Sequence, residues 1–510
     1  MNILRVSFIF ILIFVSLNSF GQPAEVVGTY GSEFSLHGNS FRFIGVNIRG
    51  ICHYGYEDIL PYTNSGHIDE NLSGVASMGG KVIRLFAPVK FAAHQQNVDR
   101  LKIVLDKMEP IGLKAIVCLT DVYNTGFNPQ GDESYYLAQP GGWTLLDDTW
   151  FSGGYQNNYL PFVELAVTQL KNHNAIFAWE LGNEITDIKN PNNIITFTSN
   201  TASAIKAIDP YHMVTTGFIS IDHTQIGESA GYTLYSDPNL DFITVHSYNG
   251  EYHWANHDVH SKAGKPLLME EYGWSEGNGD RVANALAQMG LWIDGRSVRG
   301  FMQWGYQAQS YDIGDGDNVV GMDRYAHSDY SQLFTNYQSR ASSFTNDPLP
   351  ERLTPSGENV AIYSIDWRAD SSYDGNNTGD KAFDGVVNSS NKWTSSGSIP
   401  PHWLAIDLGQ NRNVSGYTVR MAGAGGERFD YAFKEYEIQS GSSLDGPWTT
   451  EFSVNNTAQF SSVSSIYDDS VELRYIRIYI TNSGIDNYCR LPEFEVYEDP
   501  ESGISLWKVY

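Results

Sequence analysis

The sequence is organised around one stretch, residues 176–185, which reads IFAWELGNEI. Its first half is apolar and typical of a buried parallel strand, whereas its second half is a small polar tip that contains Asn183 and Glu184. In α/β barrels, a strand of this kind delivers an acidic side chain to the rim at its carboxyl end. The stretch alone fits a strand that stops at a surface turn equally well, so the surrounding sequence must distinguish the two interpretations.

Comparable apolar runs recur from residue 41 to residue 304, separated by longer amphipathic segments. Helical periodicity is clearest over Asp99–Met108, Tyr159–Leu170, Ile195–Ile208 and Arg281–Ile293. Strands that alternate with helices predict a parallel α/β architecture, and eight of them favour closure into a (β/α)8 TIM barrel. The eight expected strands are Phe41–Asn47, Lys81–Phe86, Leu113–Leu119, Ala175–Trp179, Met213–Phe218, Phe242–His246, Pro266–Glu271 and Gly300–Trp304.

A second carboxylate ends the seventh of these runs, in the stretch KPLLMEEYGW at residues 265–274. Successive strand residues point to opposite sides, so only one of Glu270 and Glu271 is expected to face the barrel opening. We choose Glu271, because the Tyr-Gly pair behind it suits a strand end, and expect Glu270 to be structural. Three strand–helix units of roughly 30 residues each separate Glu184 from Glu271, which would bring both to the same rim.

Two carboxylates at a barrel opening are the groups that hydrolysis of a glycosidic bond requires. One acts as nucleophile and the other protonates the leaving oxygen, with about 5–5.5 Å between them when configuration is retained. The acid needs a raised pKa while the nucleophile stays ionised. Arg84 places a charge inside an apolar run, where it needs a partner, and it could hold Glu271 ionised.

Other predicted strands also end in polar or aromatic residues. Tyr248 could hydrogen-bond the nucleophile, and His246 could hydrogen-bond a sugar hydroxyl. Trp304 could form the floor of the subsite beside the scissile bond. Each of them alone fits the core or the rim, but their common position at strand ends favours a site. The long insertion at residues 121–158 is rich in Gly, Tyr and Trp. It is expected to form a substrate-binding wall, although a decorative loop would occupy the same place.

These motifs carry a family resemblance: residues 41–304 resemble glycoside hydrolase family 5, within clan A of retaining (β/α)8 glycosidases. The resemblance implies that Glu184 is the acid/base, that Asn183 holds the sugar 2-hydroxyl and that Glu271 is the nucleophile. The WELGNE and EEYG forms are closest to the β-mannanases of this family, which usually carry Ala where Gly182 stands and Pro where Ile185 stands. The matching segments are Gly45–Asn47, Ile83–Leu85, Trp179–Glu184, His246–Tyr248, Glu271–Gly273 and Trp304.

The function implied by this resemblance is retaining endo-hydrolysis of β-1,4-mannan-type polysaccharide by double displacement, with no cofactor for catalysis. Three alternatives stay open on the sequence. The same chemistry could act on another β-glycan, as in cellulases and β-glucanases, or could remove single mannoses as an exo-β-mannosidase. The barrel could also be a non-catalytic carbohydrate-binding protein.

After the barrel domain, expected over residues 22–343, the alternation stops. A linker rich in Pro is expected at residues 344–356, then an antiparallel β-sandwich at 357–498 and a tail at 499–510. The motifs KAFDG (381–385), WLAIDLG (403–409), YIRI (475–478) and LPEFEV (491–496) are similar to discoidin-like (coagulation factor type C) domains, which include family 32 carbohydrate-binding modules. By that resemblance Asp384 and Glu493 would bind a structural Ca²⁺, although either could simply cap a turn. The sandwich could alternatively bind a protein or a lipid surface.

The whole chain of 510 residues is acidic, with a formal net charge of -27. This charge disfavours nucleic acid and anionic membranes as partners. A signal peptide is expected at residues 1–21, because Arg5 precedes an apolar run and small residues lead to a cleavage site near Gly21. We therefore expect a secreted, extracellular or periplasmic monomer whose partner is a polysaccharide or oligosaccharide. Three scattered cysteines predict neither a disulfide scaffold nor a zinc site.

Overall fold

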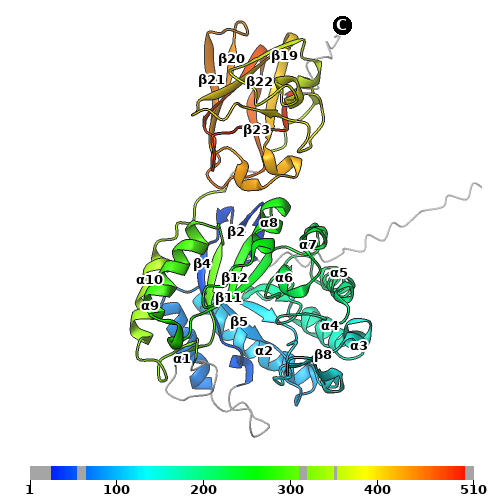
Figure 1. The fold of residues 1–510 in the computed structure, drawn as a ribbon, viewed down its shortest axis with the longest axis vertical. Coiled ribbons are helices and arrows are strands. Elements are labelled where there is room, and N and C mark those ends of the chain that lie inside the picture. Colours follow the sequence, from blue (N-terminus) through cyan, green and yellow to red (C-terminus); the bar gives the residue numbers. More distant parts are fainter. Residues whose placement is uncertain (1–24, 54–64, 309–318, 350–352, 500–510) are drawn as a thin grey trace, which may run out of the picture.

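Two units make up the described part of the chain, a barrel and a β-sandwich (Figure 1). The computed structural model describes residues 25–53, 65–308, 319–349 and 353–499. The expected signal peptide, and the expected tail beyond Asp499, lie outside these residues. Within them, none of the helices is both long and apolar enough to cross a membrane.

Eight parallel strands form the barrel, in the order β10-β9-β6-β5-β4-β13-β12-β11. The two ends of this order are joined by hydrogen bonds from Asp241 N–H to the Val214 carbonyl (2.8 Å) and from the Thr215 hydroxyl to the Phe242 carbonyl (3.0 Å). The predicted eight-stranded parallel barrel is therefore confirmed. Its strands are β4 (Phe43–Asn47), β5 (Val82–Phe86), β6 (Lys114–Cys118), β9 (Ile176–Glu180), β10 (Met213–Thr215), β11 (Ile243–Tyr248), β12 (Leu267–Gly273) and β13 (Gly300–Gln303).

The helices pack around the outside of the barrel (Figure 1). In α4 (Tyr159–Leu170) the buried residues recur every three or four positions, which gives the helix one apolar face to set against the strands. The helix predicted over Arg281–Ile293 is shorter, because α9 (Arg281–Met289) passes into a π-helical turn over Gly290–Asp294. The other helices are α1 (Ser65–Ser77), α2 (His94–Met108), α3 (Asp148–Phe151), α5 (Pro191–Ile208), α6 (Ile221–Thr224), α7 (Glu228–Tyr235), α8 (Trp254–Ala263) and α10 (Tyr330–Ser342).

A small antiparallel sheet closes the barrel at the amino-terminal ends of its strands. It consists of β1 (Gly28–Tyr30), β2 (Glu33–Leu36) and β3 (Asn39–Ser40). The Phe34 ring packs edge-on against Phe177 and Phe242, with ring centroids 5.1 and 5.2 Å apart, so this end of the barrel is plugged with apolar groups. Part of the expected linker pairs with this end of the barrel, because Leu349 N–H donates to the Gly38 carbonyl (2.8 Å) and Pro348 forms an isolated antiparallel bridge with Asn39.

The C-terminal unit is built from antiparallel strands, as predicted. The long strands β19 (His402–Arg420) and β22 (Ser462–Asn482) pair along most of their length. Strand β21 (Trp448–Asn455), whose residues are partly or fully exposed, lies at one edge of the sheet. The remaining strands are β16 (Glu358–Asn359), β17 (Asp366–Ala369), β18 (Trp393–Thr394), β20 (Glu435–Gly441), β23 (Arg490–Leu491) and β24 (Glu493–Glu498).

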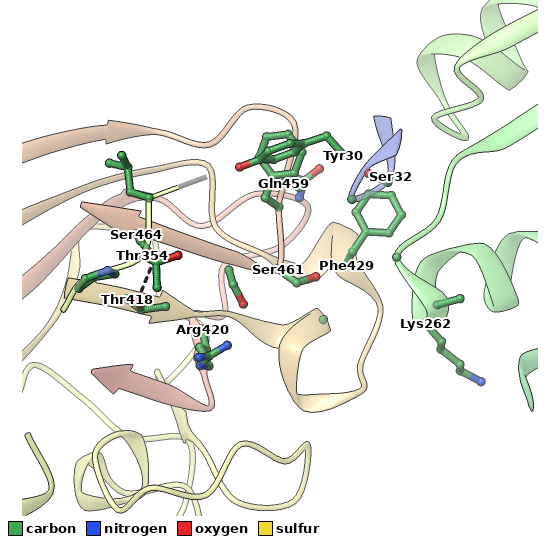
Figure 2. A pocket seen from close by; sticks show the side chains of 18 of the residues that line it. Tyr30, Ser32, Lys262, Thr354, Thr418, Arg420, Phe429, Gln459, Ser461 and Ser464 are labelled. Atoms are coloured by element: carbon green, nitrogen blue, oxygen red, sulfur yellow. Dashed lines mark hydrogen bonds between the residues drawn. The ribbon is translucent and has the colours of Figure 1, made fainter. Parts of the chain in front are cut away.

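The sandwich rests on the plugged, amino-terminal end of the barrel (Figure 1). Tyr30 packs edge-on against Phe460 at 4.5 Å, and His260 of α8 packs edge-on against Phe429 at 4.8 Å. Between the two units lies a cavity of about 500 Å³ (Figure 2), to which the barrel contributes Tyr30, Ser32 and Lys262 and the sandwich contributes hydroxyl side chains. The carboxyl ends of the barrel strands, where the sequence places the site, therefore face away from the sandwich.

Candidate active site

A second cavity, of about 600 Å³, opens at the carboxyl ends of the barrel strands. Most of the predicted site residues line it: Asn183, Glu184, Tyr248, Glu271 and Trp304. Arg84 and His246 lie directly beneath, and both are fully buried. All seven residues that the sequence assigns to catalysis and substrate binding therefore gather at one end of the barrel.

The two predicted catalytic carboxylates lie close together. One oxygen of Glu184, one oxygen of Glu271 and a ring nitrogen of His246 all lie within 4.8 Å of one another. This spacing fits the retaining arrangement, in which the carboxyl groups are about 5–5.5 Å apart, and leaves too little room for the water of an inverting reaction. Tyr248 donates its hydroxyl hydrogen to Glu271 Oε2 at 2.5 Å, as the sequence predicts.

Arg84 organises the floor of the cavity. As predicted it bonds Glu271, through Nη1, and it also forms a two-pronged pairing with Glu180, from Nε (2.6 Å) and Nη2 (2.7 Å). It also donates to the amide oxygens of Asn183 (2.8 Å) and Asn47 (3.1 Å). Burial lowers the pKa of Arg84, but the surrounding carboxylates raise it further, so the pKa lies well above its ordinary value. The cation is thereby kept charged under the site.

Glu270 does not point away from the barrel axis. The ladders of β12 shift register on both sides of this residue, so the alternation assumed from the sequence is wrong here. The choice between the two residues agrees with the structure, because of the pair only Glu271 lines the cavity, while Glu270 is fully buried beneath it and bonds His246. Burial and the charge of Glu180 raise the pKa of Glu270 to about 7.

His246 does not have a ring nitrogen available for a sugar hydroxyl, so that prediction is wrong. Its Nδ1 donates to Glu184 Oε1 (2.8 Å) and its Nε2 donates to Glu270 Oε2 (3.2 Å). Burial lowers the pKa of His246, but Glu271, Glu184 and Glu270 raise it further, to about 10. The imidazole is a charged support for the carboxylates rather than a wall of the cavity.

The protonation of Glu184 also differs from the expectation. Burial raises its pKa, but hydrogen bonds from His246 and Tyr123 lower it further, so the pKa of Glu184 lies below its ordinary value. The raised pKa expected for the acid is therefore not found at Glu184. His246, whose pKa is raised to about 10, holds its Nδ1 2.8 Å from Glu184 Oε1.

Glu184 is held in an unusual backbone conformation. Its φ is +54°, a region that costs a non-glycine residue about 1–3 kcal/mol and persists only where neighbours enforce it. The Glu184 N–H donates to the Gly217 carbonyl at 2.7 Å. Gly217 itself must lack a side chain, because a Cβ there would lie 2.3 Å from Glu180 Oε1. Local strain at this position directs the carboxylate into the cavity.

Several residues of the site were not predicted individually. The insertion at 121–158 contributes Asp121, Tyr123 and Trp143 to the cavity wall, and the Trp143 side chain is 63% exposed. The Tyr123 and Trp143 rings lie 5.6 Å apart. The abundance of Tyr and Trp in this insertion was the only sequence signal for them, because a loop has no periodicity to show which side chains face inward.

Two stretches of the chain match descriptions of known families. Residues 163–265 match "GH family 5 beta-mannosidase-like", and residues 367–494 match "F5/8 type C domain". The barrel is therefore similar to family 5 glycoside hydrolases, and the sandwich is similar to F5/8 type C domains. Both resemblances drawn from the sequence motifs are thereby confirmed.

Individual proteins resemble this chain over more than half of its length. The probable mannan endo-1,4-beta-mannosidase F of Emericella nidulans is 26% identical over 359 residues, which cover 61% of this chain and 78% of the relative. The mannan endo-1,4-beta-mannosidase A of Podospora anserina is 28% identical over 332 residues, which cover 56% and 84%. Among solved structures, the endo-1,4-beta-mannanase from Rhizomucor miehei matches 62% of this chain and 100% of its own, with 17% identity and a TM-score of 0.49.

In the F5/8 type C domain, the structure brings together the two residues predicted to bind calcium. Glu493 is fully buried; its Oε1 accepts from Gly385 N–H (2.9 Å), and among the described residues its Oε2 has no hydrogen-bond partner. Burial and the charge of Asp384 raise the pKa of Glu493 to about 7. A buried carboxylate oxygen without a partner, beside a second carboxylate, fits a cation that prefers oxygen ligands.

Proposed function

We propose that the protein hydrolyses β-1,4-linked mannan within the polysaccharide chain, with retention of configuration. The observation that carries the proposal is the pair Glu184 and Glu271 within 4.8 Å across an open cavity. The names of the relatives support the substrate class, since one is named a mannan endo-1,4-beta-mannosidase and the other a probable one. The exposed Trp143 beside the cavity supports endo action, because it offers a stacking surface for a sugar beyond the cleaved bond.

In the proposed reaction Glu271 attacks the anomeric carbon. Arg84 and Tyr248 each hold one of its oxygens, which aligns the carboxylate and keeps its charge stable without protonating it. Glu184 protonates the leaving oxygen with the proton that His246 shares through the 2.8 Å hydrogen bond. Water then attacks the anomeric carbon of the glycosyl-enzyme and breaks its bond to Glu271, while Glu184 takes the proton of the water and returns it to His246.

The test uses the two alanine variants with azide as a replacement nucleophile. Both Glu184→Ala and Glu271→Ala should lose at least about a thousandfold in kcat/KM on mannooligosaccharides. Azide should rescue Glu184→Ala with a β-glycosyl azide product, and Glu271→Ala with an α-glycosyl azide. Unchanged hydrolysis in either variant contradicts the catalytic assignment.

A polysaccharide panel separates the alternatives on substrate. Mannan, galactomannan and cellulosic glucan should be compared by product chromatography. A ladder of mannooligosaccharides supports the proposal, mannose alone shows exo action, and activity only on glucan shows the cellulase-like alternative. No hydrolysis of any glycan, together with binding, would show a carbohydrate-binding protein.

The proposal extends to the rest of the chain. A signal-like sequence at residues 1–21 supports secretion of the enzyme, which we propose acts as a monomer on extracellular or periplasmic polysaccharide. The unpartnered Glu493 oxygen beside Asp384 supports a structural Ca²⁺ in the F5/8 type C domain. We propose carbohydrate as the ligand of that domain, which binding of residues 357–498 to soluble glycans, with and without chelator, would test.

A further inference from the structure

Asp121 is a buried carboxylate at the edge of the cavity that the proposed reaction does not use. It lies three residues beyond the end of β6 and forms an isolated parallel bridge with Asn183, so the backbone itself sets the two residues side by side. Only 1% of Asp121 is exposed. Its carboxylate accepts hydrogen bonds from Asn183 Nδ2 (2.9 Å), from Tyr123 N–H (3.2 Å) and from the Thr125 hydroxyl.

The side-chain amide of Asn183 is held from both sides by groups of opposite character. Arg84, which can only donate, bonds its oxygen at 2.8 Å. Asp121, which when ionised can only accept, bonds its nitrogen at 2.9 Å. These two contacts permit a single orientation of the amide plane. They use one of the two Nδ2 hydrogens, and the other remains for a ligand in the cavity that Asn183 lines.

We propose that Asp121 is a positioning residue that fixes the Asn183 amide against the 2-hydroxyl of the sugar at the scissile bond, and that its ionisation controls this contact. The inference rests on the proposed function, because it takes Asn183 to bind the 2-hydroxyl. Contacts to this hydroxyl strengthen in the transition state of glycoside hydrolysis, so an amide out of position lowers kcat/KM more than it weakens ground-state binding.

Protonation of Asp121 disturbs the arrangement for a simple reason. Asn183 Nδ2 and the Tyr123 N–H both donate to Oδ1, whereas the Thr125 hydroxyl bonds Oδ2, so the acid proton lies on Oδ2 and is donated to Thr125. Oδ1 then accepts from Asn183 as an uncharged oxygen, and because hydrogen bonds to charged acceptors are the stronger ones, its hold on the Asn183 amide weakens.

The surroundings place this protonation in an accessible range. Burial raises the pKa of Asp121, hydrogen bonds from Thr125 and Asn183 lower it, and the charge of Glu184 raises it, to about 6 in total. The other titratable groups that face Asp121 are Tyr123 from its own loop, Tyr136 of β7 (Tyr136–Ala138), whose hydroxyl donates to the Asp121 carbonyl, and Cys118 of β6. Activity that depends on the Asn183 contact should therefore fall as the pH drops through about 6.

The experiment compares two substrates in two variants. The substrates are an aryl β-mannotrioside and its analogue that lacks the 2-hydroxyl on the sugar next to the aryl group. Asp121→Asn should lower kcat/KM roughly ten- to a hundredfold on the first, as expected when a hydrogen bond to a charged group is lost, and less than about twofold on the second. Wild-type enzyme should show an acidic limb near pH 6 on the first substrate only, and Asp121→Asn should lack it.

Asp132→Asn is the matched control. Asp132 lies in the same insertion and burial also raises its pKa to about 6, but it bonds Trp150 and Asn158 and not Asn183. This variant should keep both the acidic limb and the difference between the substrates. An equal loss by Asp121→Asn on both substrates, or an acidic limb that follows Asp132, overturns the inference.

One measurement does not depend on catalysis. In ligand-free protein with labelled asparagine, the Asn183 side-chain NH₂ resonance should shift with a midpoint near pH 6, and in Asp121→Asn it should not. A resonance that stays constant between pH 5 and 7.5 also overturns the inference. If instead the resonance titrates but neither mannoside is hydrolysed, the proposed function fails while the control of the Asn183 amide by Asp121 stands.

Discussion

Replacement of Arg84 by Met should separate its two roles, in stability and in catalysis. The guanidinium is fully buried and bonds Glu180, Glu271, Asn183 and Asn47. The Arg84→Met side chain fills a similar volume but leaves buried carboxylates without their cation. Removal of one partner from a buried ion pair costs about 3–5 kcal/mol.

This loss should be visible in thermal unfolding of the barrel. For a domain of this size about 1 kcal/mol corresponds to roughly 2–4 °C, so the unfolding temperature should fall by about 6–20 °C. Well below that temperature, kcat/KM on mannooligosaccharides should fall at least about a thousandfold, because Glu271 loses the donor that aligns it and Asn183 loses one side of its support. Calorimetry and initial-rate kinetics on the same preparation measure the two effects.

Arg299→Met provides the control. Arg299 is also buried in the barrel and pairs with Glu33 at 2.7 Å, but at the plugged end, away from the cavity. The Arg299→Met variant should lose about as much stability as Arg84→Met and should keep the wild-type kcat/KM at low temperature. If Arg84→Met unfolds at the wild-type temperature, or if both variants lose activity equally, the role assigned to Arg84 is wrong.

Three further predictions concern other parts of the chain. Trp143→Ala should raise KM for mannopentaose roughly three- to tenfold with little change in kcat. Trp254 is equally exposed but lies outside the cavity, so Trp254→Ala should leave both constants unchanged. Equal effects of the two substitutions would refute a sugar-binding subsite at Trp143. Saturating Ca²⁺, at about 100 times its dissociation constant, should stabilise the wild-type sandwich by about 2.7 kcal/mol, and the same shift in Glu493→Gln would contradict the calcium proposal. Burial holds the pKa of His260 well below its ordinary value, so as the pH drops below 6.5 the unfolded chain takes up the proton first and the free energy of unfolding should fall, by at most about 1.4 kcal/mol per pH unit. Thermal unfolding between pH 7.5 and 5 should show a shallower fall for His260→Gln than for the wild type. Parallel stability curves for the two proteins would refute this.

The positions of the two carboxylates proposed to be catalytic could be predicted because they follow from where buried strands end. Apolar runs that stop at Glu184 and Glu271 show both the strand and its boundary, and the barrel brings every such boundary to one rim. The direction of Glu270 could not be predicted, because a register shift depends on how β12 pairs with both neighbouring strands. The residue pattern of one strand contains no information about that pairing.

The role of His246 illustrates the same limit for electrostatics. Sequence shows that an imidazole lies at a strand end, but not that carboxylates occupy both of its nitrogens. The low pKa of Glu184 follows from that contact and was therefore predicted with the wrong sign. The linker shows the same limit, since its proline-rich composition predicts a linker but not that Leu349 N–H bonds the Gly38 carbonyl between β2 and β3.

The sandwich and the catalytic cavity occupy opposite poles of the barrel (Figure 1). A polysaccharide chain bound by the sandwich would have to bend around the whole barrel to reach the cavity where it would be cut. In a dense polysaccharide matrix, the geometry instead suits an enzyme that binds one polysaccharide chain and cuts a neighbouring one. Soluble oligosaccharides, which have no neighbour, would then be hydrolysed equally well with or without the sandwich, and its benefit would emerge only on packed, insoluble material.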